Sequence, residues 1–293
     1  MKVAILGQKG GWHTESLRSA LAHRGVGADC YPVTQMTAGV DHSPRLMAGG
    51  LSLDAFDVLF VRAIPAGSLE QVVFRMDALR LLEKAGVRVV NSATAIEHGV
   101  DKYYTSARLH DAGLPTPRTI VAERFEDAMA AYEMLGGDVV VKPLFGSEGR
   151  GIVRITDADT AYRAFRALEL GRYVYCLQEF VPHGRADIRV FVVGERVIGA
   201  MMRRGDAWKT NMSQGARGEP LEPDDRVIDL GLRAARVVGA EHAGVDILPA
   251  DDGTYSVIEV NTIPGWRALR AATGVDAAQR LVDHVLEGPT WTG

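Results

Sequence analysis

The sequence has little of several features that would mark a specialised class of protein. It contains only two cysteines, Cys30 and Cys176, which excludes a disulfide scaffold and a cysteine-rich zinc site. Its 33 lysines and arginines are balanced by 37 aspartates and glutamates, so no basic excess points to nucleic acid or an anionic membrane. No apolar run approaches the roughly 20 residues that a membrane-spanning helix needs. We therefore expect a cytoplasmic protein with no nucleic-acid partner and no membrane partner.

Two familiar catalytic patterns are missing as well. None of the eight histidines occurs as H-x-x-x-H or H-E-x-x-H, so nothing in the sequence indicates a catalytic zinc ion. Ser147 and Ser213 lack the G-x-S-x-G context of a hydrolase nucleophile. Cys176 lies among apolar residues of an expected strand, where packing explains it better than nucleophilic catalysis does.

What the chain does contain is the composition of an ordinary globular protein. Its 293 residues are 47% hydrophobic, and this length suits about two domains of ~150 residues each. In residues 1–95, strands are predicted at 2–6, 58–61 and 87–90, and helices at 13–24 and 69–85. Strands separated by helices indicate a parallel sheet. Residues 34–53 are rich in Gly, Ser and Pro and are expected to form long loops.

The rest of the chain follows a different pattern. A long helix is predicted at residues 95–112, closed by Gly113. An extended connector follows, because each proline of Leu114-Pro115-Thr116-Pro117 disfavours helix in the residue before it. Further strands and helices lead to a hairpin of strands 243–248 and 255–260. We expect an α/β protein with domains at residues 1–95, 96–175 and 176–293.

The sharpest geometric prediction concerns this hairpin. Asp252-Gly253 is a favoured two-residue turn, and with it at the centre Asp246 lies opposite Glu259, with Cβ atoms about 5 Å apart. Strand alternation places Asn261 on the same face as Glu259. Two unpaired carboxylates repel each other, so a bound cation resolves the arrangement, and three oxygen ligands suit Mg²⁺. The alternative is a solvated hairpin with isolated acids on its outer face.

A glycine-rich loop at residues 146–151 joins two predicted strands and is the second candidate site. Glycines let a backbone approach phosphates closely and donate N–H groups to them. The loop lacks G-x-x-x-x-G-K-[ST] and enters a strand, which favours a flap over a triphosphate rather than a P-loop. Lys142 precedes it and can reach a phosphate; the alternative is an ordinary hairpin turn. The loop residues singled out are Gly146, Ser147, Gly149 and Gly151.

Polar residues also follow the next predicted strands. Gln178 and Glu179 end an apolar strand, and Pro182 then either leaves backbone groups free for an adenine edge or simply ends an edge strand. Asp187 and Arg189 lie on one face of the following strand. The polar stretch after the next predicted strand, 196–202, suits a transferring phosphoryl group, or else forms a solvated basic loop. Its residues are Arg203, Arg204, Lys209 and Asn211.

Two features of the first domain are candidate ligand contacts. Residues 7–11, Gly-Gln-Lys-Gly-Gly, form a strand-to-helix turn whose N–H groups can meet an anion, although Lys9 replaces the second glycine of a dinucleotide-binding G-x-G-x-x-G. A tight turn or a contact to a substrate carboxylate explains it better. Arg62 follows the 58–61 strand, where ligands of parallel sheets bind, and can pair with a carboxylate or phosphate. The alternative is a surface arginine beside a turn.

Many of these segments belong to one ordered series. The series is Asp101-Lys102, Leu114-Pro115-Thr116-Pro117, Val141-Lys142-Pro143, Gly146-Ser147-x-Gly149-Arg150-Gly151, Gln178-Glu179-Phe180, Asp187-x-Arg189, Thr210-Asn211, Gly244-Val245-Asp246 and Glu259-Val260-Asn261-x-x-Pro264-Gly265. It resembles the series in ATP-grasp ligases of the RimK type. The resemblance implies an ATP-grasp fold, in which two α+β subdomains hold ATP between them, preceded by a Rossmann-like pre-ATP-grasp α/β domain.

The resemblance also implies a role for each candidate residue. ATP would be held by Lys102, Lys142, the glycine-rich loop, the adenine hinge of Gln178, Glu179, Phe180 and Val181, and Asp187 near the ribose. Two Mg²⁺ ions, which Mn²⁺ can replace, would be bound by Asp246, Glu259 and Asn261. Arg203 and Asn211 would steady the acyl phosphate and the tetrahedral intermediate, and Arg189 would help to place a substrate carboxylate.

For function, the resemblance implies Mg²⁺- and ATP-dependent joining of a carboxylate to an amine, commonly that of L-glutamate. Residues 62–77 resemble RimK-like proteins associated with tetrahydromethanopterin-type pterins, so a small-molecule pterin acceptor is our first hypothesis. A protein C-terminus or carrier protein, an ATP-grasp kinase, and a nucleotide-binding regulator without turnover are the alternatives. The complete set of Asp246, Glu259 and Asn261 argues against the regulator. We expect carboxylate and amine substrates as partners, and a homo-oligomer of two or four subunits.

Overall fold

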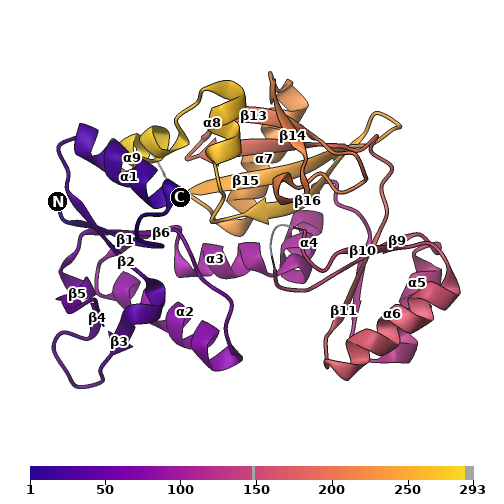
Figure 1. The fold of residues 1–293 in the computed structure, drawn as a ribbon, viewed down its shortest axis with the longest axis horizontal. Helices are drawn as coiled ribbons and strands as arrows, with labels where there is room; N and C mark the ends of the chain where they lie inside the picture. The colour runs from indigo at the N-terminus through magenta and orange to yellow at the C-terminus, as the bar shows by residue number, and fades with distance from the viewer. Residues whose placement is uncertain (147–148, 288–293) are drawn as a thin grey trace.

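The computed structural model describes residues 1–146 and 149–287, and its main sheets form three lobes (Figure 1). The first lobe contains a parallel sheet with strand order β2-β1-β6-β7, as the alternation of strands and helices predicts. Its elements are β1 (Val3–Leu6), α1 (Trp12–His23), β2 (Ala28–Tyr31), β6 (Val58–Val61), α2 (Leu69–Lys84) and β7 (Arg88–Val90). Both β1 and β6 are buried throughout, because apolar clusters cover both faces of the sheet.

The prediction of long loops at residues 34–53 is wrong, because this segment forms a small antiparallel sheet. Its strands are β3 (Met36–Ala38), β4 (Leu46–Ala48) and β5 (Leu51–Ser52), flanked by the 3₁₀ turns Val33–Gln35 and Leu53–Ala55. Met36, Leu46 and Ala48 are buried in the core of the first lobe. These strands are too short for an alternating pattern to be recognised in the sequence.

The single helix predicted at residues 95–112 is in fact two helices, α3 (Ala93–Val100) and α4 (Lys102–Asp111). Asp101 between them has an extended backbone with ψ 103°, so the first helix cannot continue through it. Its side chain accepts a hydrogen bond of 2.9 Å from the N–H of Tyr104 and so caps α4. The break places Lys102 in the first turn of a new helix.

The second lobe is an antiparallel sheet with strand order β10-β9-β11-β8, covered on one face by helices α5 and α6 (Figure 1). Its elements are β8 (Thr119–Ala122), α5 (Phe125–Met134), β9 (Val139–Lys142), β10 (Val153–Ile155), α6 (Ala158–Leu170) and β11 (Tyr175–Glu179). All of β11 pairs within this sheet. The sheets therefore place the division between the last two parts after Glu179, whereas the sequence-based division falls inside β11.

The third lobe is an antiparallel sheet with strand order β14-β13-β12-β15-β16. Its elements are β12 (Ala186–Val193), β13 (Arg196–Arg204), the 3₁₀ turn Met212–Gln214, β14 (Arg217–Leu221), α7 (Asp225–Val238), β15 (His242–Pro249), β16 (Tyr255–Asn261), α8 (Arg267–Thr273) and α9 (Ala277–Glu287). Helix α9 returns to the first lobe and lies beside α1 (Figure 1). Leu281 and Val285 thereby share one apolar core with Leu17 and Val3, so this core joins the first lobe to the third.

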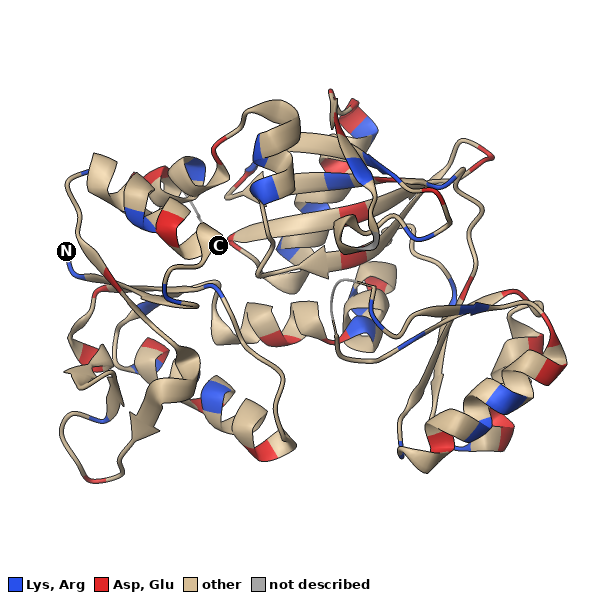
Figure 2. Ribbon diagram, viewed as in Figure 1, with Lys and Arg blue, Asp and Glu red and all other residues tan. Residues whose placement is uncertain are grey.

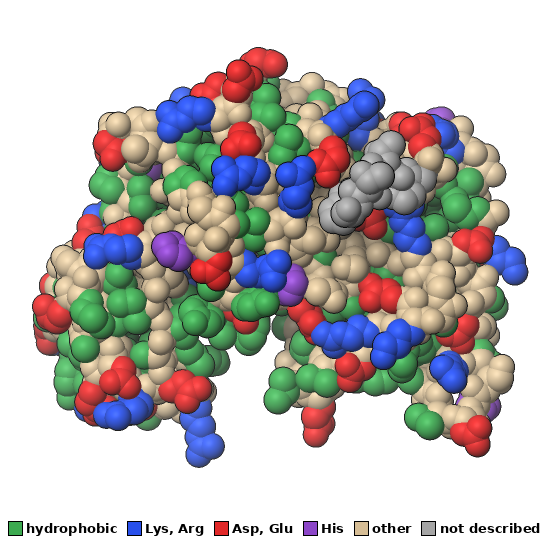
Figure 3. Space-filling model, turned by 180° about the vertical axis from the view of Figure 1, so that it is seen from behind, with side chains coloured by type: hydrophobic (Ala, Val, Ile, Leu, Met, Phe, Trp, Pro, Cys, Tyr) green, Lys and Arg blue, Asp and Glu red, His purple; other side chains and the backbone are tan. Residues whose placement is uncertain are grey.

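Charged side chains of both signs are spread over all three lobes, as Figure 2 shows for the described residues. Seen from behind in Figure 3, acidic and basic side chains likewise alternate across the surface that is coloured by type. Within residues 1–146 and 149–287, no helix is both long enough and apolar enough to cross a membrane.

Candidate nucleotide and metal site

A cleft between the second and third lobes gathers most of the residues that the sequence singles out. The predicted residues that line it are Lys102, Lys142, Gln178, Glu179, Phe180, Val181, Asp187, Arg203, Lys209, Asn211, Asp246 and Glu259. Of the remaining candidates, Gly146, Gly149, Arg189 and Asn261 contact lining residues, and Gly151 lies against Pro143, the neighbour of Lys142 in the chain. Arg204 is instead exposed and pairs with Glu219. Ser147 lies outside the described residues.

The cleft also has apolar walls that sequence reasoning missed. Val140 and Ile152 line it from the second lobe, and Leu248 and Ile258 line it from the third. Aliphatic side chains on opposing sheets form a slot that suits a planar aromatic ring. A signal was present on β9, because Val140 is two residues from Lys142 and strand alternation puts both on one face.

The predicted pairing of Asp246 with Glu259 is confirmed, although the hairpin reaches it by a different route. Near the turn the strands are one residue out of the predicted register, as the pairing of Ile247 with Val257 shows. A bulge at Ile258 then adds a residue to β16 and restores the predicted register at Asp246. The turn itself is correspondingly longer than a two-residue turn.

Oxygen atoms from both hairpin strands converge at this point. With its amide oriented to donate to Oε1 of Glu259 at 3.2 Å, Asn261 accepts a hydrogen bond from Nη2 of Arg189 at 3.1 Å. Asp246, 1% exposed, lies opposite Glu259. Carboxylate and amide oxygens are the hard donors that Mg²⁺ prefers, so these residues fit such an ion. Within residues 1–146 and 149–287 no three His, Cys, Asp or Glu side chains form a metal-binding group, so the fit depends on Asn261 and on oxygens of a nucleotide.

A buried network of ion pairs adjoins the candidate metal site. Arg203 donates to both carboxylate oxygens of Asp187, with 2.7 Å from Nε to Oδ1, and its Nη2 lies 2.9 Å from Oδ2 of Asp246. Arg189 also donates twice to Asp246, with 2.5 Å from Nη2 to Oδ2. Burial opposes the ionisation of Asp246, but attraction to Arg189 and Arg203 outweighs it and holds the pKa of this carboxyl below its usual range. The network fixes Arg203 on the wall of the cleft and holds Arg189 behind Asp246.

Lys142 reaches into the cleft from the end of β9. Its Nζ donates a hydrogen bond of 2.5 Å to Oε1 of Gln178, whose amide in turn donates to Thr119 at 2.9 Å. Burial lowers the pKa of Lys142, and the nearby Glu259 opposes this shift. The lysine is therefore held at a defined point facing the candidate metal site, as a phosphate contact requires.

The glycine-rich loop is held over the catalytic candidates at two points. Lys102 donates a hydrogen bond of 2.6 Å from Nζ to the carbonyl oxygen of Gly146. Gly149, at φ 70°, lies so close to Asn211 that a Cβ atom on it would be 2.3 Å from Oδ1. Only glycine permits both this backbone conformation and this approach. The loop thus comes close to Asn211 at Gly149.

The connection between β11 and β12 has the features of a hinge. The backbone N–H groups of Glu179 and Phe180 donate to the carbonyls of Arg118 and Asp138, both at 3.0 Å. In the described part of the chain, the N–H of Val181 has no protein acceptor and can meet the edge of a base. The carboxylate of Glu179 is engaged by Arg118, with 2.6 Å to its Nε.

Family models match two consecutive parts of the chain. Residues 99–285 match the RimK-like ATP-grasp domain, and residues 1–96 match the RimK PreATP-grasp domain. The chain belongs to the RimK-like ATP-grasp family. This confirms the family and fold predicted from the motifs, and makes the protein an ATP-dependent ligase of a family that binds ATP with Mg²⁺.

Two ligases illustrate the range of its relatives. The tetrahydromethanopterin:alpha-L-glutamate ligase of Methanococcus maripaludis is 34% identical over 291 residues, which cover 98% of this chain and 98% of that protein. The glutamate–LysW ligase ArgX of Sulfolobus acidocaldarius is 29% identical over 240 residues, which cover 80% of this chain and 83% of that protein.

Solved structures show the same ATP-grasp fold. The ATP-grasp ligase PsnB complexed with minimal precursor aligns with a TM-score of 0.78 and 24% identity over 98% of this chain and 99% of PsnB. A RimK domain protein from Sphaerobacter thermophilus aligns with a TM-score of 0.76 and 23% identity over 97% of this chain and 98% of that protein. Another PsnB structure holds Mg and ADP together with the precursor.

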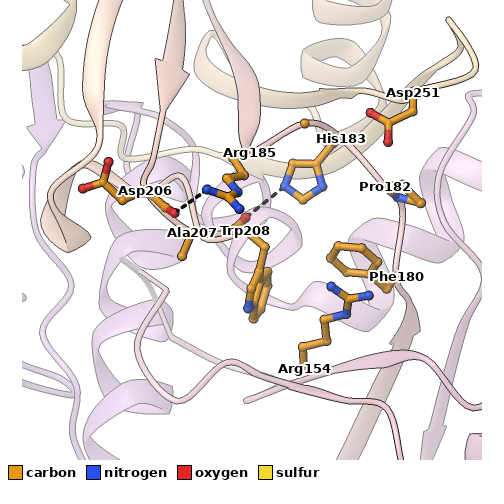
Figure 4. A pocket seen from close by; sticks show the side chains of 10 residues that line it. Arg154, Phe180, Pro182, His183, Arg185, Asp206, Ala207, Trp208 and Asp251 are labelled. Atoms are coloured by element: carbon orange, nitrogen blue, oxygen red, sulfur yellow. Dashed lines mark hydrogen bonds between the residues drawn. The ribbon is translucent and has the colours of Figure 1, made fainter.

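This RimK-like ligase has a second hollow next to the hinge, of about 440 Å³, which the sequence did not predict (Figure 4). Phe180, His183 and Trp208 line both it and the cleft. His183 joins the two sides of this wall, with 2.9 Å from Nε2 to the carbonyl oxygen of Trp208. The guanidinium of Arg154 lies 3.5 Å from the centre of the Phe180 ring. The hollow therefore shares a wall with the hinge.

Proposed function

We propose that this ligase uses ATP and Mg²⁺ to add L-glutamate to a small-molecule acceptor of the tetrahydromethanopterin type. The observation that supports this most strongly is the 34% identity, over 98% of both chains, to a ligase named for that reaction. Relatives of the same name from Methanosarcina acetivorans and Methanocaldococcus jannaschii are 33% and 34% identical. A match over 98% of the chain includes the first lobe, where residues 62–77 favoured a pterin acceptor from sequence.

In this proposal the reaction proceeds through an acyl phosphate. A carboxylate oxygen of the acceptor attacks the γ-phosphorus of ATP, and ADP leaves. The uncharged amine of glutamate then attacks the acyl carbon, and loss of inorganic phosphate leaves an amide. Bound Mg²⁺ supplies Lewis-acid stabilisation of the phosphate charge. No covalent bond to the protein is needed, which agrees with Cys176 being 1% exposed inside β11.

The cleft supplies a contact for each part of ATP. The aliphatic slot and the N–H of Val181 receive adenine, and Lys142 faces the phosphates under the glycine-rich loop. Asp187 lines the ribose end while it remains bonded to Arg203. The residues proposed to hold ATP are Lys102, Lys142, Gly146, Gly149, Gly151, Gln178, Glu179, Phe180, Val181 and Asp187.

The metal and catalytic roles follow from the same convergence. Asp246, Glu259 and Asn261 hold two Mg²⁺ ions, for which Mn²⁺ can substitute. Arg203 and Asn211, both on the cleft wall, stabilise the negative charge that develops on the phosphoryl group and on the tetrahedral intermediate. Arg189, bonded to Asp246, helps to place a substrate carboxylate, and its bond to the amide of Asn261 holds it beside the metal site.

A carrier protein as acceptor is the second candidate function. It is supported by the identity of 29% to a glutamate–LysW ligase, which is lower and covers less of the chain than the pterin match. The oligomeric state, two or four subunits, stays a prediction.

The proposed function can be tested by a screen for ADP release with panels of amino acids and acceptors, followed by mass spectrometry of the products. We expect ADP formation to require a carboxylate acceptor such as tetrahydromethanopterin, and a stable product to require L-glutamate as well. Glutamylation of a carrier protein in place of the pterin would favour the second candidate. A stable phosphorylated product formed without any amine would identify a kinase and contradict the proposal.

A further inference from the structure

The first lobe has a ligand-binding position that the ATP cleft does not use. In its strand order, β2-β1-β6-β7, the next strand β2 pairs with one edge of β1 and the later strand β6 pairs with the other edge. The carboxyl ends of β1 and β6 therefore form a topological switch point, where open α/β sheets bind ligands. Gly7 follows β1 and Arg62 follows β6, and a Cβ atom on Gly7 would lie 3.2 Å from that of Arg62.

Arg62, at the start of this switch point (the first-lobe corner, formed by residues 7–11, Arg62 and residues 264–266), has most of its hydrogen-bonding capacity unused. Nη2 donates to the carbonyl oxygen of Pro264 at 2.7 Å, and the guanidinium lies 4.1 Å from the centre of the Trp266 ring. Nε and Nη1 are buried without any hydrogen-bond partner. Among the residues that the structure describes, no carboxylate forms an ion pair with it, and burial lowers the pKa of Arg62 to about 9. The alternative interpretation from the sequence, that Arg62 is a surface arginine beside a turn, is therefore wrong.

The groups around Arg62 do not neutralise it. His242, 3% exposed, has no hydrogen-bond partner on either ring nitrogen, and Nε1 of Trp266 has none either. Burial and the positive charge of Arg62 lower the pKa of His242 to about 3, and burial with the charges of Arg62 and Arg267 lowers the pKa of His13 to about 4. Both histidines are therefore neutral near pH 7. Arg62 is partly buried, and its unpartnered Nε and Nη1 lie out of contact with solvent, so an anion that pairs with this cation would lower the cost of keeping it there.

Two further features favour an anion here. Helix α1 begins near Arg62, whose charge acts on His13 in the first turn, and its N-cap Gly11 has no side chain to accept from the first N–H groups of the helix. The corner also adjoins the reaction centre. Pro264 follows Asn261 in the chain, and a Cβ atom on Gly244 would lie 3.0 Å from Pro264 Cβ and 3.5 Å from Nη1 of Arg189.

We propose that Arg62, flanked by the 7–11 turn at the start of α1, binds a substrate carboxylate that is not consumed in the reaction. The inference rests on the proposed ligase function, which brings such groups to the neighbouring cleft. Nη2 has a second N–H group besides the one bonded to Pro264, so one edge of the planar guanidinium is left to pair with a carboxylate through two hydrogen bonds. This carboxylate belongs either to L-glutamate or to the acceptor, and the experiment distinguishes the two sources.

The first arm of the test needs no turnover. Thermal unfolding is followed in glutarate and in chloride at equal ionic strength, for the wild type, Arg62→Ala, Arg62→Lys and Lys84→Ala. Lys84 is the matched control, because it is an exposed cation of the same lobe. We expect glutarate to raise the midpoint of the wild type and of Lys84→Ala, to raise that of Arg62→Lys less, and to leave that of Arg62→Ala unchanged. Equal responses in the wild type and both Arg62 variants would overturn the inference.

The second arm identifies the carboxylate by calorimetry on the complexes with Mg²⁺ and AMPPNP. If glutamate provides it, Arg62→Ala weakens L-glutamate binding roughly tenfold to a hundredfold and leaves tetrahydromethanopterin binding unchanged. Loss of the preference for L-glutamate over L-glutamine would assign the side-chain carboxylate. If the acceptor provides it, the pattern is reversed. Both ligands binding Arg62→Ala as tightly as the wild type would contradict the inference.

A purely structural role for Arg62 gives a different result. If it only holds the 262–266 loop through Pro264 and Trp266, Arg62→Ala lowers the unfolding midpoint and AMPPNP affinity while carboxylate binding is kept, which would overturn the proposal. Arg62→Lys, which keeps the charge but not the fork, decides the case if Arg62→Ala does not fold. A wild type that binds neither substrate would contradict the proposed function, and the glutarate arm would then decide the inference alone.

Discussion

Arg203 and Arg62 show how differently the ATP cleft and the first lobe are built. Arg203, 3% exposed on β13, is paired with the carboxylates of Asp187 and Asp246. Arg62, at the end of β6, hydrogen-bonds only a carbonyl oxygen among the described residues. Burying a charge costs several kcal/mol unless a counter-charge compensates for it. The fold thus provides its own counter-charges in the cleft, whereas the first lobe leaves this task to a ligand.

The largest loss of activity is expected at Glu259, in the candidate metal site beside the ion-pair network. Glu259→Ala should reduce turnover about 10³-fold or more, because it removes a metal carboxylate that contributes several kcal/mol of transition-state stabilisation. ADP release at saturating Mg²⁺ measures the loss, and circular dichroism shows that the variant is folded. Glu219→Ala, on β14, is the control for the loss of an exposed acid. Near wild-type turnover in a folded Glu259→Ala protein would show that the metal assignment is wrong.

The balance in the cleft can be broken directly at Arg203. Arg203→Ala leaves Asp187 and Asp246 buried together and should lower the free energy of unfolding by about 3–5 kcal/mol. The neighbouring Arg204 pairs with Glu219 at 3.1 Å, but both side chains are 55% exposed, so Arg204→Ala should cost less than about 1 kcal/mol. Urea denaturation compares the two variants. Equal losses would mean that burial of the network does not matter.

The two hairpins of the third lobe show what sequence could and could not predict. The pairing of Asp246 with Glu259 followed from strand patterns, but it arises through a bulge that the sequence did not reveal. A register shift between Phe191 and Val192 likewise leads to the pairing of Asp187 with Arg203. Bulges depend on packing against the rest of the sheet, so local patterns do not locate them. Residue types and their order were therefore enough to predict which residues come together in the cleft, whereas the exact strand register could not be predicted.

Contacts between distant parts of the chain could not be predicted from local patterns either. The sequence placed Arg62 after a parallel strand, but its burial depends on Pro264 and Trp266, which lie in a distant part of the chain. The break at Asp101 was missed because the helical pattern continues across it, and only the capping hydrogen bond to Tyr104 reveals a new helix.

Nucleotide affinity sharpens the comparison between the two regions. Lys142→Ala should weaken ATP binding roughly tenfold to a hundredfold, because it removes a charged hydrogen bond to phosphate. Arg62→Ala and Lys84→Ala should leave ATP affinity unchanged, since the residues proposed to hold ATP all belong to the other two lobes or to α4. Calorimetric titration measures all three. Equal weakening by Lys142→Ala and Lys84→Ala would remove the phosphate assignment.

A smaller effect is expected from pH in the first-lobe corner. The pKa of His242 is lowered from 6.5 to about 3, so the folded state keeps this residue neutral while the unfolded state takes up a proton below pH 6.5. Its contribution to stability is therefore complete above pH 6.5 and is lost as the pH falls. Between about pH 7.5 and about pH 5 the wild type should lose about 2 kcal/mol more than His242→Phe. Identical pH dependence in urea denaturation would contradict the buried neutral state.

The central claim, that ATP activates a carboxylate in the cleft, is tested most directly by isotope transfer. The protein is incubated with ATP, Mg²⁺, L-glutamate and an acceptor whose carboxyl oxygens are labelled with ¹⁸O, and the released phosphate is analysed by mass spectrometry. Formation and aminolysis of an acyl phosphate carry one carboxyl oxygen into each phosphate, so the phosphate should contain one labelled oxygen per turnover. Amide formation with unlabelled phosphate would contradict the account.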